Sequence, residues 1–285
     1  MEKLHIADVR PETSFVTILP GQRLPLRVTD NEGHAVATNW KADGGEVAYG
    51  KNLAVWQAPL NPGPHELKAT AKIGGETITR TLTAIVTVPA VKASAGSLDG
   101  YPIGHYPRGL HSDPSAEANR GTRDHYDTPN GFIELSRDNL DLPVSQHYTL
   151  GDFAGKDSWV NGHKFLFLRP KLVQKLETII STINAEGYHA GKIDLLSGYR
   201  SPWLNADIGN TTTLSRHTYG DAADMIVADF NGDGRVNRTD AEILWNVVNK
   251  IDHTTKLTGG AGFYNPTSAH GYFIHTDTRG FIARW

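Results

Sequence analysis

The stretch SRHTYGDAADM, residues 215–225, places a histidine and an aspartate seven residues apart, at His217 and Asp224. The glycine and alanines between them would let the backbone turn closely around a bound ion. Imidazole nitrogen and carboxylate oxygen are zinc ligands, and catalytic zinc sites commonly combine three protein ligands with a water. The alternative for this spacing is a polar turn with an aspartate cap and a buried histidine.

A second stretch with metal-binding side chains, YFIHTDTRG, begins at Tyr272. If it forms a strand, His275 and Asp277 project from the same face, because side chains alternate along a strand. His275 is therefore a candidate for the third ligand. The sequence contains no cysteine, so a zinc site in this protein must use His, Asp or Glu.

Four stretches of the chain resemble segments of one enzyme family. SRHTYGDAAD resembles the Ser-x-His-x-x-Gly-x-Ala-x-Asp signature of the zinc D-Ala-D-Ala carboxypeptidases, which belong with lysostaphin-type peptidases and the hedgehog signalling domain. SGYRSPWLN, LPVSQHYTLGDF and GGAGFYNPTSAHGYFIHTDTRGFIARW resemble other segments of the family. The resemblance covers residues 130–285. It implies the family's α+β zinc fold with an antiparallel sheet and the zinc ligands His217, Asp224 and His275.

The resemblance also implies roles for side chains around the metal. Arg200 would stabilise the oxyanion that develops on the substrate carbonyl, or alternatively would pair with a carboxylate for structural reasons. Tyr199 and Ser215 would contact the substrate. Ser215 is not expected to be a nucleophile, because no Gly-x-Ser-x-Gly context surrounds it.

The resemblance does not identify the general base. Many relatives carry Glu or Asp three residues before the last histidine, where this chain has Tyr272, and some carry a histidine two residues before it, where this chain has Phe273. Asp277 and His270 are the local candidates, although Asp277 could instead orient the His275 ring. This gap keeps open a zinc protein that binds wall peptides without cleaving them.

A second metal-binding pattern, DFNGDGRVNRTD, spans residues 229–240. It resembles EF-hand and dockerin calcium loops, whose spacing wraps oxygen ligands around one point; an Asx-rich turn without metal is the alternative. Dockerins pair two such loops to bind cohesin, whereas this chain has one, so we expect a structural calcium ion beside the zinc site. The expected calcium ligands are Asp229, Asn231, Asp233, Arg235 through its backbone carbonyl, Asn237 through a water, and Asp240.

The elements that must position these residues follow an α+β pattern from about residue 129 onward. Apolar residues at helical period predict a helix from Arg169 to Gly187, with Pro170 suited to its first turn. A second helix is predicted over Thr239–Ile251. Strands are predicted at Ile193–Leu196 and in the stretch GYFIHTDT.

The first 90 residues predict an all-β module. Short alternating runs are separated by turn sequences such as DNEG and NPGP, which is typical of a small sandwich. The middle of this region resembles bacterial immunoglobulin-like modules, with Trp40 and Trp56 expected in the core. The predicted organisation is an Ig-like sandwich over 1–90, a linker or irregular segment over 91–128, and the zinc domain over 129–285, with the calcium loop inserted at 229–240.

Composition limits the partners and the location. A chain of 285 residues with 39% hydrophobic and 21% charged residues suits a globular protein of two domains, and its net charge of −3 does not favour nucleic acid. No apolar run approaches the roughly 18 residues of a membrane span. Met1–Leu4 does not begin a signal peptide. The protein is then either cytosolic or exported with a leader outside this sequence, and we expect export to the periplasm, cell surface or medium.

These observations predict a zinc peptidase that hydrolyses peptide bonds in peptidoglycan, as a D-Ala-type carboxypeptidase or an endopeptidase. One alternative is a non-catalytic zinc protein that binds peptidoglycan peptides. Another is a surface adhesion or assembly protein that acts through the N-terminal sandwich. The partner of that sandwich would be the cell wall or another protein.

Overall fold

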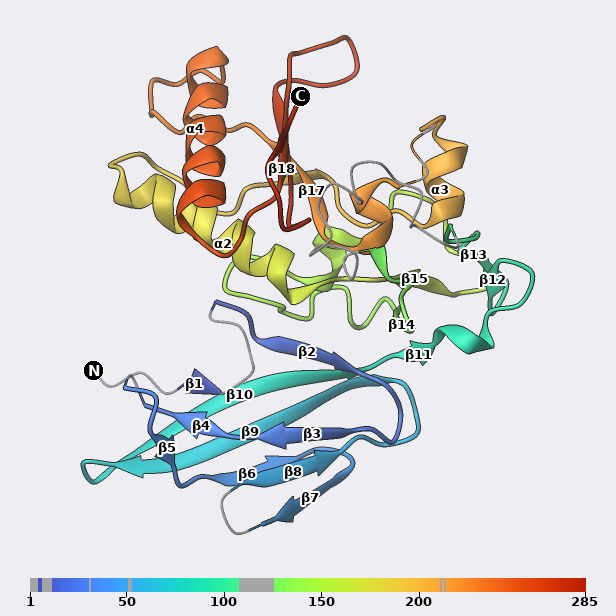
Figure 1. The fold of residues 1–285 in the computed structure, drawn as a ribbon, viewed down its shortest axis with the longest axis vertical. Helices are drawn as coiled ribbons and strands as arrows, with labels where there is room; N and C mark the ends of the chain where they lie inside the picture. Colours follow the sequence, from blue (N-terminus) through green and yellow to red (C-terminus); the bar gives the residue numbers. More distant parts are fainter. Residues whose placement is uncertain are drawn as a thin grey trace.

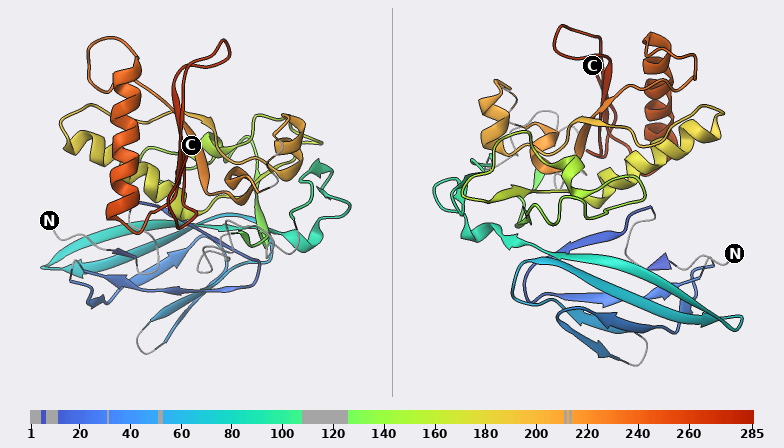
Figure 2. Two further views of the ribbon diagram at one scale, coloured as in Figure 1. Left: turned by 45° about the horizontal axis from the view of Figure 1, so that its top comes forward. Right: turned by 180° about the vertical axis from the view of Figure 1, so that it is seen from behind.

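The computed structural model describes residues 5–6, 12–30, 32–50, 53–107, 126–210, 212 and 214–285. An all-β part formed by the beginning of the chain lies against a part that contains the helices and further sheets (Figure 1). Seen from behind, the two parts still lie against each other and are joined near β11 (Val88–Pro89) (Figure 2). The chain is therefore a mixed α+β protein.

Two sheets face each other in the N-terminal part and enclose a core that includes Trp40, Trp56 and Leu67. Burial of both tryptophans confirms their predicted place. The likeness to immunoglobulin-like modules stays a prediction. One sheet has the order β2 (Phe15–Ile18), β10 (Glu76–Val86), β9 (Gly63–Ile73) and β6 (Asn39–Ala42). The other has the order β3 (Arg23–Leu26), β8 (Ala54–Gln57) and β7 (Glu46–Tyr49), and a small third sheet has the order β1 (His5–Ile6), β4 (Val28–Thr29) and β5 (Ala35–Val36).

A five-stranded sheet dominates the second part. Its pairings are antiparallel except for the parallel pairing of its last strand. The strand in the centre of this sheet confirms the predicted strand in GYFIHTDT, whereas the first strand begins two residues later than predicted. The order is β16 (Leu195–Ser197), β17 (Ala222–Ile226), β19 (Phe273–Asp277), β18 (Gly260–Tyr264) and β20 (Ala283–Arg284).

Two long helices pack with this sheet. Helix α2 (Pro170–Ala185) begins at a proline, as predicted, and buries a stripe of leucine, valine and isoleucine side chains. Gly187, with φ of 87°, follows its end and adopts the left-handed conformation that glycine tolerates. Helix α4 (Arg238–Thr254) extends beyond the predicted Thr239–Ile251 at both ends and contacts α2 and the sheet.

The segment between the two parts is packed where the structure describes it. Strand β11 pairs with β14 (Gly131–Leu135), which also pairs with β15 (Lys164–Leu166). A short helix and a small hairpin lie in the region predicted as an irregular linker. Leu98 and Tyr101 of the hairpin and the following Ile103 join the core of the second part. Residues 108–125 of that predicted linker lie outside the described residues. The hairpin and helix are η1 (Ala90–Lys92), β12 (Ser97–Leu98) and β13 (Tyr101–Pro102).

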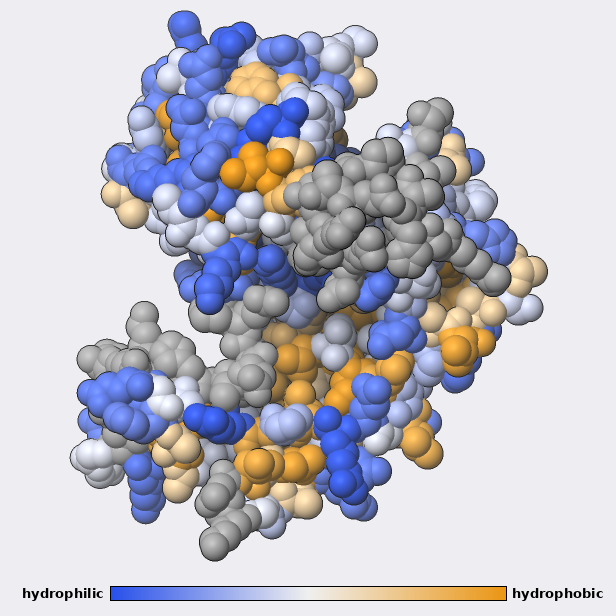
Figure 3. Space-filling model, in the orientation of Figure 1, coloured by the Kyte–Doolittle hydropathy of each residue, from blue (hydrophilic) through white to orange (hydrophobic). Residues whose placement is uncertain are grey.

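The surface differs between the two parts. Apolar side chains gather on the face of the N-terminal part shown in Figure 3, whereas the face of the second part is mainly hydrophilic. None of the helices in the described part of the chain combines the length and apolar character that crossing a membrane requires.

Candidate metal centre

Three neighbouring elements carry the predicted zinc ligands. His217 lies in the short helix η5 (Arg216–Tyr219), Asp224 lies in β17, and His275 lies in β19. Asp224 and His275 are direct partners in the antiparallel ladder, so their side chains emerge side by side. Gly220, with φ of 66°, ends η5, and a Cβ there would overlap the backbone of Phe167. Glycine thus permits the sharp return from η5 into β17.

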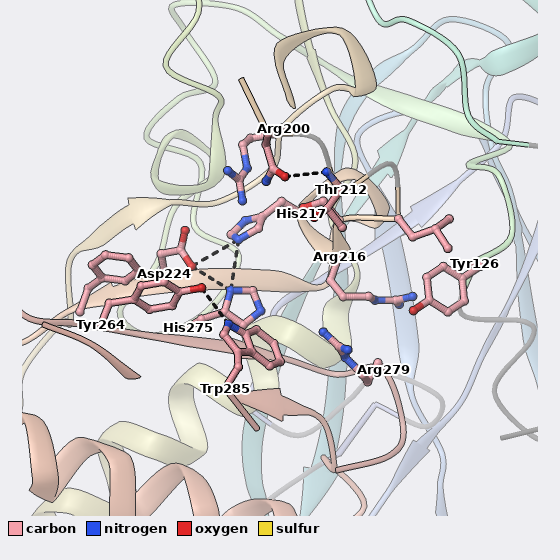
Figure 4. A pocket seen from close by; sticks show the side chains of 14 residues that line it. Tyr126, Arg200, Thr212, Arg216, His217, Asp224, Tyr264, His275, Arg279 and Trp285 are labelled. Carbon is pink, nitrogen blue, oxygen red and sulfur yellow. Dashed lines mark hydrogen bonds and ion pairs between the residues drawn. The ribbon is translucent and has the colours of Figure 1, made fainter. Parts of the chain in front are cut away.

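The three side chains converge on one point. The Nε2 atom of His217 lies 3.3 Å from His275 Nδ1 and 3.3 Å from Asp224 Oδ1, and His275 Nδ1 lies 2.8 Å from the same oxygen (Figure 4). All three residues are buried. One ligand atom from each lies within 4.8 Å of the other two. Two imidazole nitrogens and one carboxylate oxygen facing a common centre form the donor set that zinc prefers.

Hydrogen bonds fix the orientation of both imidazole rings. The Nδ1 atom of His217 donates to the carbonyl oxygen of Gly198 at 2.7 Å. On the far side of His275, Nε2 lies 3.3 Å from Asp277 Oδ2. Such partners select the tautomer of a metal-binding histidine and hold its ring. In each histidine of the ligand set, the ring nitrogen that points away from the centre therefore has a partner that holds the ring.

Asp277 lies behind His275 and not in the pocket. Its carboxylate is fully buried, accepts a hydrogen bond from the Gly260 amide at 2.8 Å, and is paired with the Arg279 guanidinium at 2.6 Å. Of the two roles predicted for Asp277, this position corresponds to orienting His275. As a general base, Asp277 would have to reach the pocket past the ring that it supports.

The electrostatics of the cluster keep its carboxylate charged. Burial alone would raise the pKa of Asp224, but His217 and His275 hold that pKa well below its ordinary value. Burial lowers the pKa of His217, against the opposing effect of Asp224. Burial acts in the same direction on His275, yet its hydrogen bonds to Asp224 and Asp277 raise the pKa of that ring.

Arg200 lies in the same pocket with spare hydrogen-bonding capacity. Its Nε atom is buried and has no partner among the described residues. Burial lowers the pKa of its guanidinium, and the nearby Asp224 opposes that shift. No ion pair of Arg200 with a carboxylate is present among the described residues, as the structural alternative would require. A buried N–H without a partner is uncommon in a native structure.

The two predicted substrate contacts have different positions. Ser215 lines the pocket, directly before η5. Tyr199 does not: it is 2% exposed, and its hydroxyl lies 3.1 Å from that of Tyr106 in the core. Tyr199 is therefore not among the described residues that line the pocket. Consecutive residues of an extended segment point to opposite sides, so a chain that directs Arg200 into the pocket directs Tyr199 away from it.

His270, the other predicted base, also lies outside the pocket lining. Its Nδ1 atom donates to the carbonyl oxygen of Gly271 at 2.8 Å, and its ring packs on the Phe273 ring at 4.8 Å. Tyr272, at the position where many relatives carry an acid, packs against Phe263. Neither side chain is among the described residues that line the pocket.

The pocket has a volume of about 720 Å³ and contains residues that the sequence did not single out. Arg216 forms a buried ion pair with Asp221, five residues later, and its guanidinium lies 4.3 Å from the centre of the Tyr126 ring. The Arg-to-Asp spacing inside SRHTYGDAAD was the available signal for this pair. The other lining residues missed are Asn210, Thr212, Leu214, Tyr264, Phe273, Arg279 and Trp285.

The loop 229–240 is held by its own hydrogen bonds. Asp229 accepts bonds from the amides of Gly232 and Gly234, each at 2.8 Å. Asp240 is buried and caps α4 by accepting from the Asn237 amide at 3.0 Å. The side-chain amides of Asn231 and Asn237 approach Asp233 Oδ2 at 3.3 and 3.5 Å. Among the described residues, Asp229, Asp233 and Asp240 do not form a cluster of ligand atoms as tight as that of the zinc ligands.

A comparison with protein families gives a match over part of the chain. No curated protein matches the chain. Residues 152–241 match the family model of Peptidase M15, a stretch that contains α2, Arg200, His217 and Asp224 but not His275. The members of that family are zinc-dependent peptidases, and the match supports placing this part of the chain among them.

Proposed function

We propose that this protein is a zinc peptidase that hydrolyses peptide bonds in bacterial peptidoglycan. The observation that carries the proposal is the buried cluster of His217, Asp224 and His275, whose ligand atoms lie within 4.8 Å of one another at the base of a pocket. The match to the Peptidase M15 family over residues 152–241 supports the same reaction class and substrate type.

The donor set fits zinc. His217 Nε2, Asp224 Oδ1 and His275 Nδ1 would hold the ion, and the opposite nitrogens of both rings are already bonded to Gly198 and Asp277. Bound zinc supplies the Lewis acidity that activates water near neutral pH and polarises a scissile carbonyl. Three protein ligands leave room for water and substrate, as catalytic sites require.

Arg200 would act on the substrate during hydrolysis. Its guanidinium, at the lining of the pocket, would donate a hydrogen bond to the carbonyl oxygen of the scissile peptide bond as negative charge develops there. Among the described lining residues, Asp224 is the one carboxylate. The lack of a second acid in that lining makes a non-catalytic protein that binds wall peptides the second candidate.

Metal analysis combined with a peptidoglycan digest tests the proposal. We expect about one zinc per chain and release of wall peptides that stops when a chelator is added. Free D-alanine among the products would identify a carboxypeptidase, and shortened crosslinked peptides would identify an endopeptidase. Zinc without any turnover would favour the second candidate, and no zinc after repletion would contradict both.

We also propose that loop 229–240 binds a structural calcium ion. The spacing of Asp229, Asn231, Asp233 and Asp240 supports it, as does the approach of two asparagine side chains to Asp233. Binding would require the carboxylates to move closer together than they are here. The competing explanation is an Asx-rich turn that caps α4 without metal.

The substrate class supports export of the protein to the periplasm, cell surface or medium, where peptidoglycan lies. We further propose that residues 1–90 form an immunoglobulin-like module that contacts the cell wall or another protein. Pull-down of intact sacculi by the full chain and by a version with changes in the pocket would separate this binding from binding at the zinc site.

A further inference from the structure

We propose that Tyr264 and Trp285 form a substrate-positioning wall beside the metal ligands, in which the Tyr264 hydroxyl donates a hydrogen bond to a main-chain carbonyl of the bound peptide. This inference rests on the proposed peptidase function. Both residues line the pocket, and both are large aromatic side chains left partly open, at 36% and 50% exposure. In Figure 4 they lie next to Asp224 and His275.

The two side chains are fixed to each other by a directed hydrogen bond. Trp285 Nε1 donates to the Tyr264 hydroxyl oxygen at 2.7 Å. An indole N–H can only donate, so the tyrosine oxygen acts as the acceptor in this bond. Its own proton has no acceptor among the described residues and remains available to a ligand. A peptide in the pocket offers carbonyl oxygens as acceptors for that proton.

A glycine in β18, Gly262, leaves room for this aromatic pair. Gly262 lies opposite His275 in the ladder between β18 and β19. A Cβ at Gly262 would overlap the indole of Trp285 and come within 2.8 Å of the Tyr264 ring. On both sides of this glycine the main chain is bonded to Trp285, through the Ala261 carbonyl at 3.3 Å and the Phe263 amide at 3.0 Å. The indole of Trp285 thus occupies the space beside His275 that a side chain at position 262 would fill.

The wall is connected to the metal ligands through a closed ring of contacts. The Trp285 ring lies 5.1 Å from the His275 ring, and the Arg279 guanidinium lies 5.2 Å from the centre of the indole. Arg279 is paired with Asp277, which contacts His275 on its far side. On its other flank Tyr264 stacks on Phe273 at 4.3 Å, nearly parallel. Both aromatic side chains are therefore held in one place relative to the ligand.

A matched set of conservative variants tests the wall. The probe is a synthetic peptidoglycan stem pentapeptide that ends in D-Ala-D-Ala. We expect Tyr264→Phe to raise KM about tenfold while kcat changes by less than about twofold, since the lost bond contributes to binding rather than to the chemical step. Trp285→Phe keeps an aromatic ring but removes the bond that holds Tyr264, so it should raise KM similarly. The double variant should be little worse than either single one, because the two changes remove one shared interaction.

Two controls and one further readout complete the test. Trp203→Phe changes a tryptophan that is 41% exposed outside the pocket, and Tyr272→Phe changes a neighbouring tyrosine outside the lining; both should match the unchanged protein. Calorimetric titration of the zinc-free protein with the same peptide should show weaker binding for Tyr264→Phe. Unchanged KM and unchanged binding in Tyr264→Phe and Trp285→Phe would overturn the wall. If the unchanged protein bound the peptide without cleaving it, and also released no peptides from crosslinked peptidoglycan, weaker binding by Tyr264→Phe would support the wall while contradicting the proposed hydrolysis.

Discussion

The Nε2 atom of His275 lies 3.3 Å from the Oδ2 atom of Asp277, two residues further along the same strand. The other nitrogen of this ring, Nδ1, faces Asp224 and His217. One imidazole thus connects a buried carboxylate on its far side to the metal centre on its near side. This arrangement gives Asp277 an orienting role that is separable by experiment from general-base catalysis.

Asp277→Asn should lower zinc affinity by about 10–100-fold, because the substitution weakens the partner that fixes the tautomer of His275. Competition with a zinc-binding dye measures this affinity directly. At saturating zinc, much of the turnover should return. A variant with normal zinc affinity but no turnover at saturating zinc would instead identify Asp277 as the base.

His217→Ala and His275→Ala should each abolish stoichiometric zinc binding, since two remaining ligands are too few for a stable site. Elemental analysis after zinc repletion and gel filtration gives the metal content. His253→Ala, an exposed position on α4, should retain the full content. Zinc retained at one ion per chain in either ligand variant would refute this ligand set.

Arg200→Ala should reduce kcat by about 10²–10³-fold, the typical effect of removing one donor to a developing oxyanion. Zinc content should not change, because Arg200 is not in the ligand set. Arg238→Ala removes an exposed arginine paired with Glu242 and serves as control. A structural role for Arg200 would appear instead as a lower melting temperature with kcat preserved.

Lys175→Met should destabilise the protein by about 1–3 kcal/mol, because it removes one of the two cations paired with the buried Asp252 carboxylate and leaves only Arg284. Lys175 is fully buried in α2, and its Nζ lies 2.6 Å from Asp252 Oδ1 and 2.7 Å from the Asp277 carbonyl oxygen. Urea unfolding measures the free energy. Lys250→Met breaks an exposed pair with Glu186 and should cost no more than about 1 kcal/mol; equal costs would argue against a structural role for the buried pair.

Asp233→Ala should remove a calcium-dependent increase in melting temperature, if loop 229–240 binds calcium. At a calcium concentration about 100-fold above Kd, binding to the folded state adds about 2.7 kcal/mol. Thermal unfolding with and without calcium measures the shift, with the exposed Asp207→Ala as control. If calcium does not change the melting temperature of the unsubstituted protein, the loop is a hydrogen-bonded turn that caps α4 without metal.

The sequence predicted the elements whose pattern is local. Apolar residues at helical period located α2, and the alternation of His275 and Asp277 correctly placed both on one face of β19. The start of β16 was missed by two residues because its run of apolar residues begins before the first ladder pair, Leu195 with Met225. Strand ends depend on the partner strand, which a single segment does not reveal.

The composition of the pocket was predicted only in part. The spacing of His217 and Asp224 left a metal site and a polar turn open, and the resemblance to zinc peptidases favoured the metal site. Trp285 and Tyr264 carried no signal, because their meeting depends on Gly262 and on the pairing of β18 with the end of the chain. Tyr199 lies outside the pocket lining, because adjacency to Arg200 in sequence does not imply a shared face.

The pairing of β11 with β14 limits how this protein can be divided. Val88 lies opposite Phe132 in one sheet, the Ser14 amide donates to the Val144 carbonyl at 3.0 Å, and Phe15 belongs to the core of the second part. The N-terminal module is thus attached to the second part at two places, the β11–β14 pairing and the contacts of Ser14 and Phe15. A force applied to that module would be transmitted through these two contacts to the part of the chain that carries His217, Asp224 and His275. A transfer of the N-terminal module to another protein would have to include the residues of the second part that make both contacts.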